Sequence, residues 1–240
     1  MRNSPAKAHF QRHAAAAMQA GGEHGPVDKA MANQYELMLA KLAEDRRRLK
    51  GVQSIEKKAE VKRLLLPEYQ PWIEGVLKGD SGQQDDVFMT ALIWTIDIGD
   101  IAGALPLARY AIGHKLVLPD QYQRTTACLI AEEAADIALK DVAASAASLE
   151  SLAEVLDLTA AEDMPDEVRA KLHKAIGYAA RERAGGDAAG EGLAYLQGAV
   201  DHLKRALALH DKVGVKKDIE RLEVLIKNSA GTGGNPPAAG

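Results

Sequence analysis

Cysteine, aromatic side chains and long apolar runs are all scarce in this chain of 240 residues. Cys128 is the single cysteine, which excludes an internal disulfide or a Cys-rich zinc module and fits a reducing cytosol. Aromatic residues make up 4% of the chain, too few for an all-β sandwich, and no period-two apolar alternation occurs. No apolar run reaches the roughly 18 residues of a membrane span, and the N-terminal MRNSPAKAHFQRH is too polar for a secretory signal. These absences predict a soluble, intracellular, all-α protein without a membrane partner.

The common catalytic motifs are missing as well. The sequence has no Gly-rich phosphate loop, no Ser nucleophile elbow and no zinc-protease signature. His9 and His13 have the i,i+4 spacing of a metal-binding pair, but no third ligand is adjacent, so we interpret them as polar surface residues. Cys128 lies in an apolar helix and is expected to be a small buried side chain. We therefore expect no catalytic residue, no metal site and no cofactor.

Pairs of acidic residues are the feature that favours a metal-dependent nuclease. Such an enzyme needs several carboxylates that converge within a few ångströms. Most of these acids instead stand where helices are expected to begin, so capping and the helix dipole explain them. The pairs are Asp85 with Asp86, Asp97 with Asp100, Glu132 with Glu133, and Asp163 with Asp166.

Charge is distributed unevenly along the chain, whose net charge is −4. Residues 1–63 carry a net charge of +6, residues 64–200 carry −12, and residues 201–240 carry +2. A basic front on an acidic body indicates that the front contacts a polyanion. The alternative is that basic residues merely keep a long helix soluble.

The front of the chain is predicted to be helical. Ser4 and Pro5 form a favourable helix start, and residues 1–27 are expected to be a basic helix followed by a Gly-rich linker. Residues 28–66 have apolar positions near seven-residue spacing, which predicts a long helical hairpin or coiled-coil-like segment. This segment is either one long helix or two helices that meet at Gly51, and it could pair with a partner helix.

Residues 67–228 are predicted to form an acidic body of stacked helix pairs. Pro67 is expected to stop the helix before it, so that a separate short helix ends at Gly79. Ser81 and Gln84 match a capping box for the following helix. Residues 229–240 are expected to be a disordered tail. Later helices are expected at about 121–140, 147–157, 165–183, 190–212 and 215–227.

The densest basic cluster lies between Lys41 and Arg63, with nine basic and four acidic residues. Successive helical residues turn by about 100°, so Arg46, Arg47 and Arg48 cannot share one face and would form a broad basic collar. A collar suits contact with phosphates better than the reading of base edges. The alternative is a solvated helix surface with pairs such as Glu44 and Arg48.

Several stretches together resemble the terminase small subunits of tailed phages, in the GpM-like branch. The resemblance covers roughly residues 4–225. It rests on SPAKAHFQRHAAAAM, YELMLAKLAEDRRRLK, LLPEYQPWIEGVL, QDDVFMTALIWTIDIGDIAGALPLARYAI, LDLTAAEDMPDEVRAKLHKAIG and GVKKDIERLE, in this order.

The resemblance implies a role in DNA packaging. Members bind viral double-stranded DNA at the packaging start, form homo-oligomeric rings and recruit a large subunit that carries the ATPase and the nuclease. The family is also described as the endonuclease subunit of terminase, which we interpret as cleavage by the holoenzyme. Its members would act in the host cytoplasm and be absent from the mature virion.

Carried onto this chain, the resemblance gives two sets of residues. The DNA-contact set is Arg2, Lys7, Arg12, Arg46, Arg47, Arg48, Lys50, Lys57 and Lys58. The subunit-packing set is Tyr35, Leu39, Leu42 and Leu49.

Two other functions stay open. DIAGALPLARYAI and AVDHLKRALALHD have the alternation of small and large apolar residues typical of helical-repeat adaptors, although no regular 34-residue period is present. A true nuclease would nick DNA by itself with a divalent metal.

Overall fold

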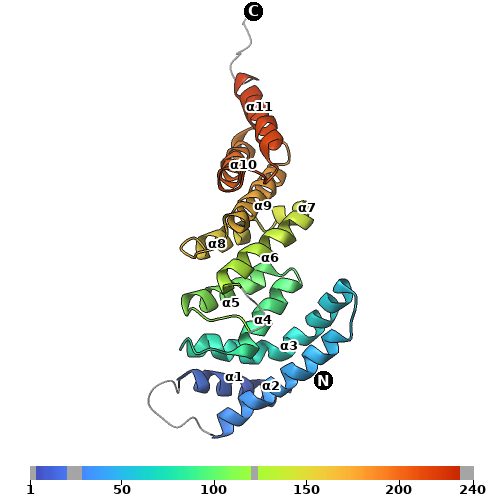
Figure 1. Ribbon diagram of the computed structural model, residues 1–240, viewed down its shortest axis with the longest axis vertical. Coiled ribbons are helices and arrows are strands. Elements are labelled where there is room, and N and C mark those ends of the chain that lie inside the picture. The colour runs from blue at the N-terminus through green and yellow to red at the C-terminus, as the bar shows by residue number, and fades with distance from the viewer. Residues whose placement is uncertain (1–3, 21–28, 120–123, 233–240) are drawn as a thin grey trace, which may run out of the picture. The chain divides into compact units, whose positions relative to one another are not determined.

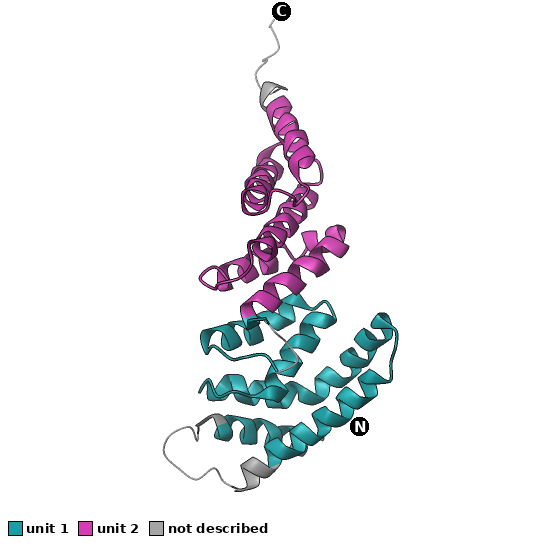
Figure 2. Ribbon diagram, viewed as in Figure 1, with its two compact units in different colours: residues 1–126 teal, residues 127–240 magenta. Residues whose placement is uncertain are grey.

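The computed structural model describes residues 4–20, 29–119 and 124–232, and within them it contains helices and no strand, which confirms the all-α prediction (Figure 1). The chain divides into two compact units, residues 1–126 and 127–240 (Figure 2). The first unit holds α1 (Pro5–Ala20), α2 (Lys29–Lys50), α3 (Ile55–Gly79), α4 (Asp86–Asp97) and α5 (Ile101–Gly113). From the unit boundary onwards follow α6 (Thr126–Lys140), α7 (Val142–Ala146), α8 (Leu149–Leu158), α9 (Asp166–Ala184), α10 (Gly190–Leu209) and α11 (Lys216–Thr232).

In the first unit, α1 packs closely against α3 through small residues. Ala14 and Ala15 are fully buried, and a Cβ at Gly75 would lie 2.3 Å from the carbonyl oxygen of Arg12. The Ala-rich run that begins after Ser4 therefore has a packing role. The Ser4 hydroxyl accepts the Lys7 amide hydrogen and confirms the expected helix start.

The structure corrects the prediction that Pro67 stops a helix. α3 runs from Ile55 to Gly79 with Pro67 and Pro71 inside it. A proline removes one helical N–H and costs roughly 3 kcal/mol in a helix interior. A continuous buried stripe spans both prolines and lies against the neighbouring helices, and this packing offsets the loss. The stripe consists of Leu65, Tyr69, Trp72 and Val76.

The expected capping box at Ser81 is also wrong, because Asp85 caps α4. One carboxylate oxygen of Asp85 accepts the backbone N–H groups of Val87 and Phe88, each at 2.9 Å, and the other accepts Trp72 Nε1 at 2.8 Å. Asp85 is 2% exposed, so it joins α3 to the start of α4 inside the core. Gln84 instead exchanges two hydrogen bonds with the backbone of Val117.

The other expected caps differ in outcome. Asp100 caps α5 by accepting the Gly103 amide hydrogen at 2.8 Å, as expected. Asp163 caps no helix, since α9 begins at Asp166 behind Pro165, which offers no side-chain acceptor. Proline presets the backbone angle there, so a cap is not required for the helix to begin.

The second unit is built mainly from the antiparallel pair α9 and α10, with α11 covering α10. Its core is rich in alanine and leucine: Ala180, Leu196, Ala199 and Leu203 are all 5% exposed or less. α6 begins at Thr126, later than the expected 121, and the short α7 was not expected. α11 extends to Thr232, beyond the expected start of the tail, and residues 233–240 lie outside the described part.

The expected boundary between residues 66 and 67 falls within a helix of the first unit. The sequence placed residues 28–66 apart from the body that begins at residue 67. In the structure, residues 55–79 form one helix inside the first unit. The basic segment is therefore built into the same core as α4 and α5.

Candidate nucleic-acid interface

A groove in the first unit brings basic side chains of α2 and α3 together above α4. We call it the basic groove, and its volume is about 490 Å³. Its residues are Ala43, Arg46, Arg47, Leu49, Lys50, Lys58, Lys62, Thr90, Ile93, Trp94 and Asp97. Five of them are basic and one is acidic, so the groove suits an anion.

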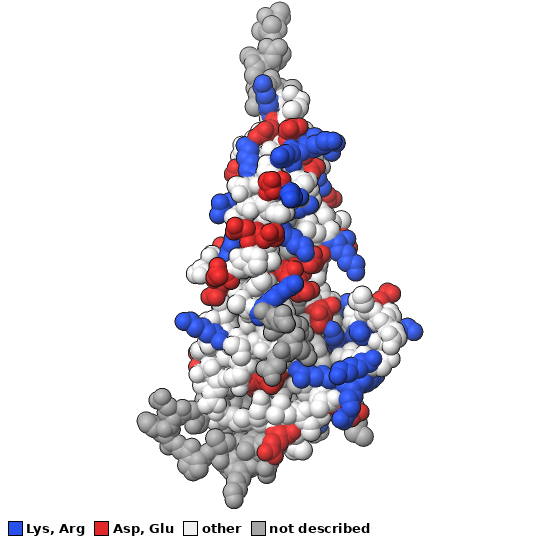
Figure 3. All heavy atoms as spheres, in the orientation of Figure 1, with Lys and Arg blue, Asp and Glu red and all other residues white. Residues whose placement is uncertain are grey.

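The local sequence explains why these cations gather. α2 ends at Lys50, and Ser54 caps α3 by accepting the Lys57 amide hydrogen, so the chain reverses within a few residues. Basic residues in the last turn of α2 also lie at the negative end of its helix dipole. In Figure 3 Lys and Arg side chains gather over this end of the α2–α3 hairpin.

The floor of the basic groove is apolar and rigid. Leu49, Ile93 and Trp94 are 5–7% exposed and belong to the core of the unit. Trp94 packs edge-to-face against Tyr69, with ring centroids 5.7 Å apart. The cations therefore stand on a fixed base, and burial of the floor lowers the local dielectric around them.

Arg46 is the basic side chain held most firmly within the groove. Its Nη2 donates to Thr90 Oγ1 at 2.6 Å, and the Thr90 hydroxyl donates in turn to the carbonyl of Asp86 at 2.7 Å. Because Thr90 is neutral, Arg46 keeps its full positive charge for another anion. A guanidinium has five N–H donors, so most remain available.

Two other cations of the groove have an internal counter-charge. Arg47 pairs with Glu44, one turn earlier on α2. Lys62 pairs with Asp97 at the end of α4, and the Lys62 side chain is 15% exposed. An external anion would have to displace Glu44 or Asp97 to bind these two cations.

The structure brings together four residues of the DNA-contact set and separates the others. Arg46, Arg47, Lys50 and Lys58 line the groove, and the exposed Arg48 and Lys57 lie on the same two helices. Lys7 is exposed on α1, and Arg12 donates to Glu74 of α3 at 2.6 Å. Arg2 lies outside the described residues.

Three groove residues were missed by sequence reasoning. Lys62 belonged to the basic cluster but not to the DNA-contact set, and neither Thr90 nor Asp97 was considered for this surface. Lys62 alone had a usable signal, because it stands four residues after Lys58 and so shares its helix face.

Comparison with known proteins places the chain in a family. Residues 39–167, more than half of the chain, match the family described as phage small terminase subunit. The chain belongs to this family. It is 48% identical over 225 residues to "Terminase, endonuclease subunit" of Escherichia phage P2, which covers 93% of this chain and 86% of that protein. No solved structure matches it. The resemblance inferred from the motifs is confirmed.

In this small terminase subunit the subunit-packing set is largely engaged within the chain itself. Leu42 and Leu49 are 2% and 7% exposed. Tyr35 stacks on Trp72 with ring centroids 5.7 Å apart, and Leu39 is half-buried. The apolar seam therefore builds the first unit, and its use between subunits stays a prediction that concerns Tyr35 and Leu39.

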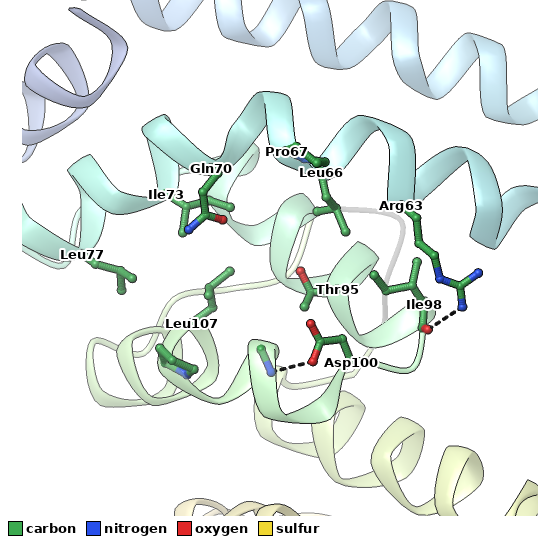
Figure 4. A pocket seen from close by; sticks show the side chains of 12 residues that line it. Arg63, Leu66, Pro67, Gln70, Ile73, Leu77, Thr95, Ile98, Asp100 and Leu107 are labelled. Carbon is green, nitrogen blue, oxygen red and sulfur yellow. Dashed lines mark hydrogen bonds between the residues drawn. The ribbon is translucent and has the colours of Figure 1, made fainter. Parts of the chain in front are cut away.

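A second hollow in the same unit is mainly apolar and has a volume of about 650 Å³ (Figure 4). Leu66, Ile73 and Leu77 of α3 face Ile98 and Leu107 across it. At the rim, an Arg63 N–H donates to the Ile98 carbonyl at 3.0 Å, and Asp100 makes the cap of α5. We call this the apolar hollow.

Three of the acidic residues singled out in the sequence have structural partners in the first unit. Asp85 and Asp100 serve as helix caps, and Asp97 pairs with Lys62. Among the described residues no three His, Cys, Asp or Glu side chains are grouped so that they could hold a metal ion. A search of the same residues finds no helix with the length and apolarity needed to cross a membrane.

Proposed function

We propose that this small terminase subunit binds viral double-stranded DNA at the packaging start through the basic groove. In this proposal it also assembles as a homo-oligomeric ring and recruits and regulates a large ATPase–nuclease subunit in the host cytoplasm. The observation that carries the DNA role is the gathering of five cations from two helices above a rigid apolar floor. Membership of the family supports the packaging role.

The physical basis of binding is counterion release from the DNA backbone. Each phosphate that a Lys or Arg neutralises releases condensed cations, so the logarithm of affinity falls with the logarithm of salt at a slope of roughly −0.9 per contact. One groove supplies only a few contacts. A ring presents several copies to one duplex, so modest contacts are multiplied by effective concentration.

Ring assembly would use surfaces that the single chain leaves exposed. Among the subunit-packing set, Tyr35 and Leu39 keep accessible surface, and Leu37 on the same helix is 63% exposed. Successive helical residues turn by about 100°, so Leu37 lies on a different side of α2 from Tyr35 and Leu39 and offers a second candidate contact between subunits. Sedimentation of the full chain and of Leu37→Glu tests this placement, since loss of the oligomer is expected in the variant.

Competition binding across a salt series tests the DNA role. The full chain is mixed with a labelled fragment that carries the packaging start and competed with the same or a shuffled fragment. Stronger competition by the specific fragment at moderate salt is the expected result. Equal and salt-sensitive competition would assign sequence specificity to the large subunit, and absence of binding would overturn the DNA role.

A helical adaptor is the second candidate function, and the apolar hollow favours it. Side chains from Arg63 to Leu77, about four turns of α3, line one side of the hollow, a length suited to a short amphipathic helix of another protein. Leu66→Glu should abolish binding of the purified large subunit and leave DNA binding unchanged if this function applies. Loss of large-subunit binding together with DNA binding would indicate unfolding and is checked by circular dichroism.

The name of the phage P2 relative raises the question of cleavage by this chain alone. We propose that this chain positions DNA and that the large subunit cuts it. Supercoiled DNA incubated with the full chain and magnesium or manganese should therefore stay intact. Metal-dependent nicking that is lost in Glu132→Ala with Glu133→Ala would reverse this assignment.

A further inference from the structure

We propose that the basic groove contains one fixed phosphate seat, Arg46 held by Thr90, and one masked seat, Lys62 held by Asp97. The inference rests on the proposed DNA binding and names the chemistry of the site, which is a phosphodiester oxygen on an oriented guanidinium. It gives Thr90 the role of a positioning residue and Asp97 that of an internal competitor for DNA.

The fixed seat follows from the hydrogen bonds of a single hydroxyl. The Thr90 hydroxyl has one proton, which it donates to the Asp86 carbonyl at 2.7 Å. Its lone pairs are therefore left to accept the Arg46 N–H at 2.6 Å. Thr90 is 3% exposed and lies in the middle of α4, so its position is set by the core. Arg46 is thus ordered before any ligand arrives.

A long side chain that is already ordered in the free protein loses less conformational entropy when it binds a ligand. Immobilising a flexible side chain on association costs about 0.5–1.5 kcal/mol. The contact with Thr90 has already restricted Arg46 in the free protein. The contact uses no opposite charge, so the attraction to phosphate is retained. Arg46 accordingly differs from the exposed Arg48 on the same helix, for which no such neutral anchor is found among the described residues.

The masked seat follows from the ion pair of Lys62. The Lys62 and Asp97 side chains are 15% and 32% exposed, so their pairing is shielded from much of the solvent. A carboxylate and a phosphate compete for the same ammonium donors. DNA must therefore displace Asp97 to use Lys62, which weakens binding to any sequence and keeps the affinity of a single subunit low.

Thr90→Val tests the fixed seat because it replaces the hydroxyl by a methyl group of similar volume. We expect DNA affinity to fall about two- to tenfold at 0.1 M salt, which follows from the ordering cost of one side chain. The slope against salt should stay unchanged, since no charge is lost. Thr90→Ser keeps the hydroxyl and should restore the affinity of the unmodified protein.

Asp97→Asn tests the masked seat by removing the competing charge. We expect affinity to rise about threefold or more and the salt slope to steepen by roughly one contact. Glu36→Gln is the matched control, because this exposed acid lies on α2 ten residues from Arg46, about 15 Å along the helix axis. At 0.15 M salt that distance exceeds the screening length of about 8 Å, so little change is expected.

The outcomes separate this inference from the proposed function. If the unmodified protein binds DNA while Thr90→Val and Asp97→Asn both bind as it does, the two seats are wrong and the DNA role stands. An Asp97→Asn variant with weaker binding would overturn the masked seat alone. If the unmodified protein binds no DNA, the proposed function and this inference both fail. Melting of each variant by circular dichroism verifies that it is folded.

Discussion

The two units distribute their basic residues differently. In the first unit, basic side chains of α2 and α3 gather around one groove. In the second unit, Figure 3 shows Lys and Arg interspersed with Asp and Glu, and ion pairs join its helices. Lys171 pairs with Asp136, Arg183 with Glu150, and Lys204 with Glu223. The first unit also holds ion pairs, two of them at the groove, but there five cations share one surface with a single acid, so a net positive charge is left for an external anion.

The cores of the two units also differ in composition. The first unit has a buried network of aromatic and polar groups, in which Tyr69 donates to Asp45 at 2.6 Å and Trp72 to Asp85. The second unit packs mostly alanine and leucine between α9 and α10. Hydrogen-bonded cores specify one geometry and lose much when one partner is removed. The unit that carries the basic groove is therefore the one whose core geometry is fixed by buried hydrogen bonds.

Asp85→Ala is expected to lower the folding stability of the first unit more than any other change proposed here. It removes the cap of α4 and leaves the buried Trp72 N–H without its acceptor, for a combined loss of about 3 kcal/mol. Both tryptophans of the chain, Trp72 and Trp94, belong to this unit, so their fluorescence during urea unfolding measures the effect. The control is Asp141→Ala, which removes an exposed cap of α7 in the second unit and should leave the tryptophan transition in place.

Charge reversal at the basic groove should remove the difference in anion binding between the two units. Changing Arg46, Arg47 and Arg48 to Glu is expected to weaken DNA binding on the order of a hundredfold at 0.1 M salt and to flatten the salt slope by about three contacts. The readout is fluorescence anisotropy with packaging-start and shuffled fragments, which should weaken alike.

A matched control changes the same number of charges in the second unit. Lys216, Lys217 and Arg221 are exposed on α11, and their replacement by Glu gives an equal change in net charge. This variant should lose much less affinity, because Lys216, Lys217 and Arg221 do not line the basic groove. Equal losses in both variants would mean that net charge alone controls binding and that the groove has no special role.

Glycine to alanine changes should have opposite signs in the two units. A Cβ at Gly75 of α3 would lie 2.3 Å from a backbone oxygen of α1, so Gly75→Ala should destabilise the first unit by about 2 kcal/mol. Gly198 in α10 has nothing within 4 Å of an added Cβ, and Gly198→Ala should stabilise the second unit by about 0.5–1 kcal/mol. Thermal melts would show one decrease and one increase, and two decreases would contradict the packing described here.

The sequence predicted those features that depend on neighbours along the chain. Ser4 and Asp100 cap helices as expected, and helical periodicity located most elements. The prediction that Pro67 ends a helix was wrong, because the local cost of the proline is outweighed by a stripe of core residues whose partners lie on other helices. The prediction that Ser81 caps the next helix was wrong, because Asp85, four residues later, caps it and has a buried partner on α3.

The basic cluster was visible in sequence, but its internal order was not. Three consecutive arginines turn to different sides of α2, and only Arg46 and Arg47 line the groove. Arg46 reaches Thr90 across 44 residues, and Lys62 reaches Asp97 across 35 residues. Such contacts depend on how α4 approaches the hairpin, which helical spacing does not encode. The sequence thus indicated a surface for anions. The structure distinguishes Arg46, which is held by the neutral Thr90, from Lys62, which is held by the acidic Asp97.

A pH dependence of similar size is expected in the second unit. Nδ1 of His173 on α9 and Nδ1 of His202 on α10 are 3.0 Å apart. Burial, followed by the nearby His202, Arg205 and Arg169, lowers the pKa of His173 to about 4. Between pH 6.5 and about 4 the unfolded chain therefore binds more protons at this position than the folded chain, so stability decreases as the pH falls.

For this half-buried group, solvent screening reduces the expected loss between pH 7 and pH 5 to about 1 kcal/mol. His173→Asn removes the titrating ring and should flatten this dependence in urea unfolding followed by circular dichroism. His9→Asn, at an exposed position on α1 in the first unit, is the matched control and should keep the slope of the unmodified protein. The tryptophan signal of the first unit should be insensitive to His173→Asn at both pH values, because the histidine pair links only α9 to α10. If His173→Asn and His9→Asn showed the same dependence of stability on pH, the histidine pair would not be its source.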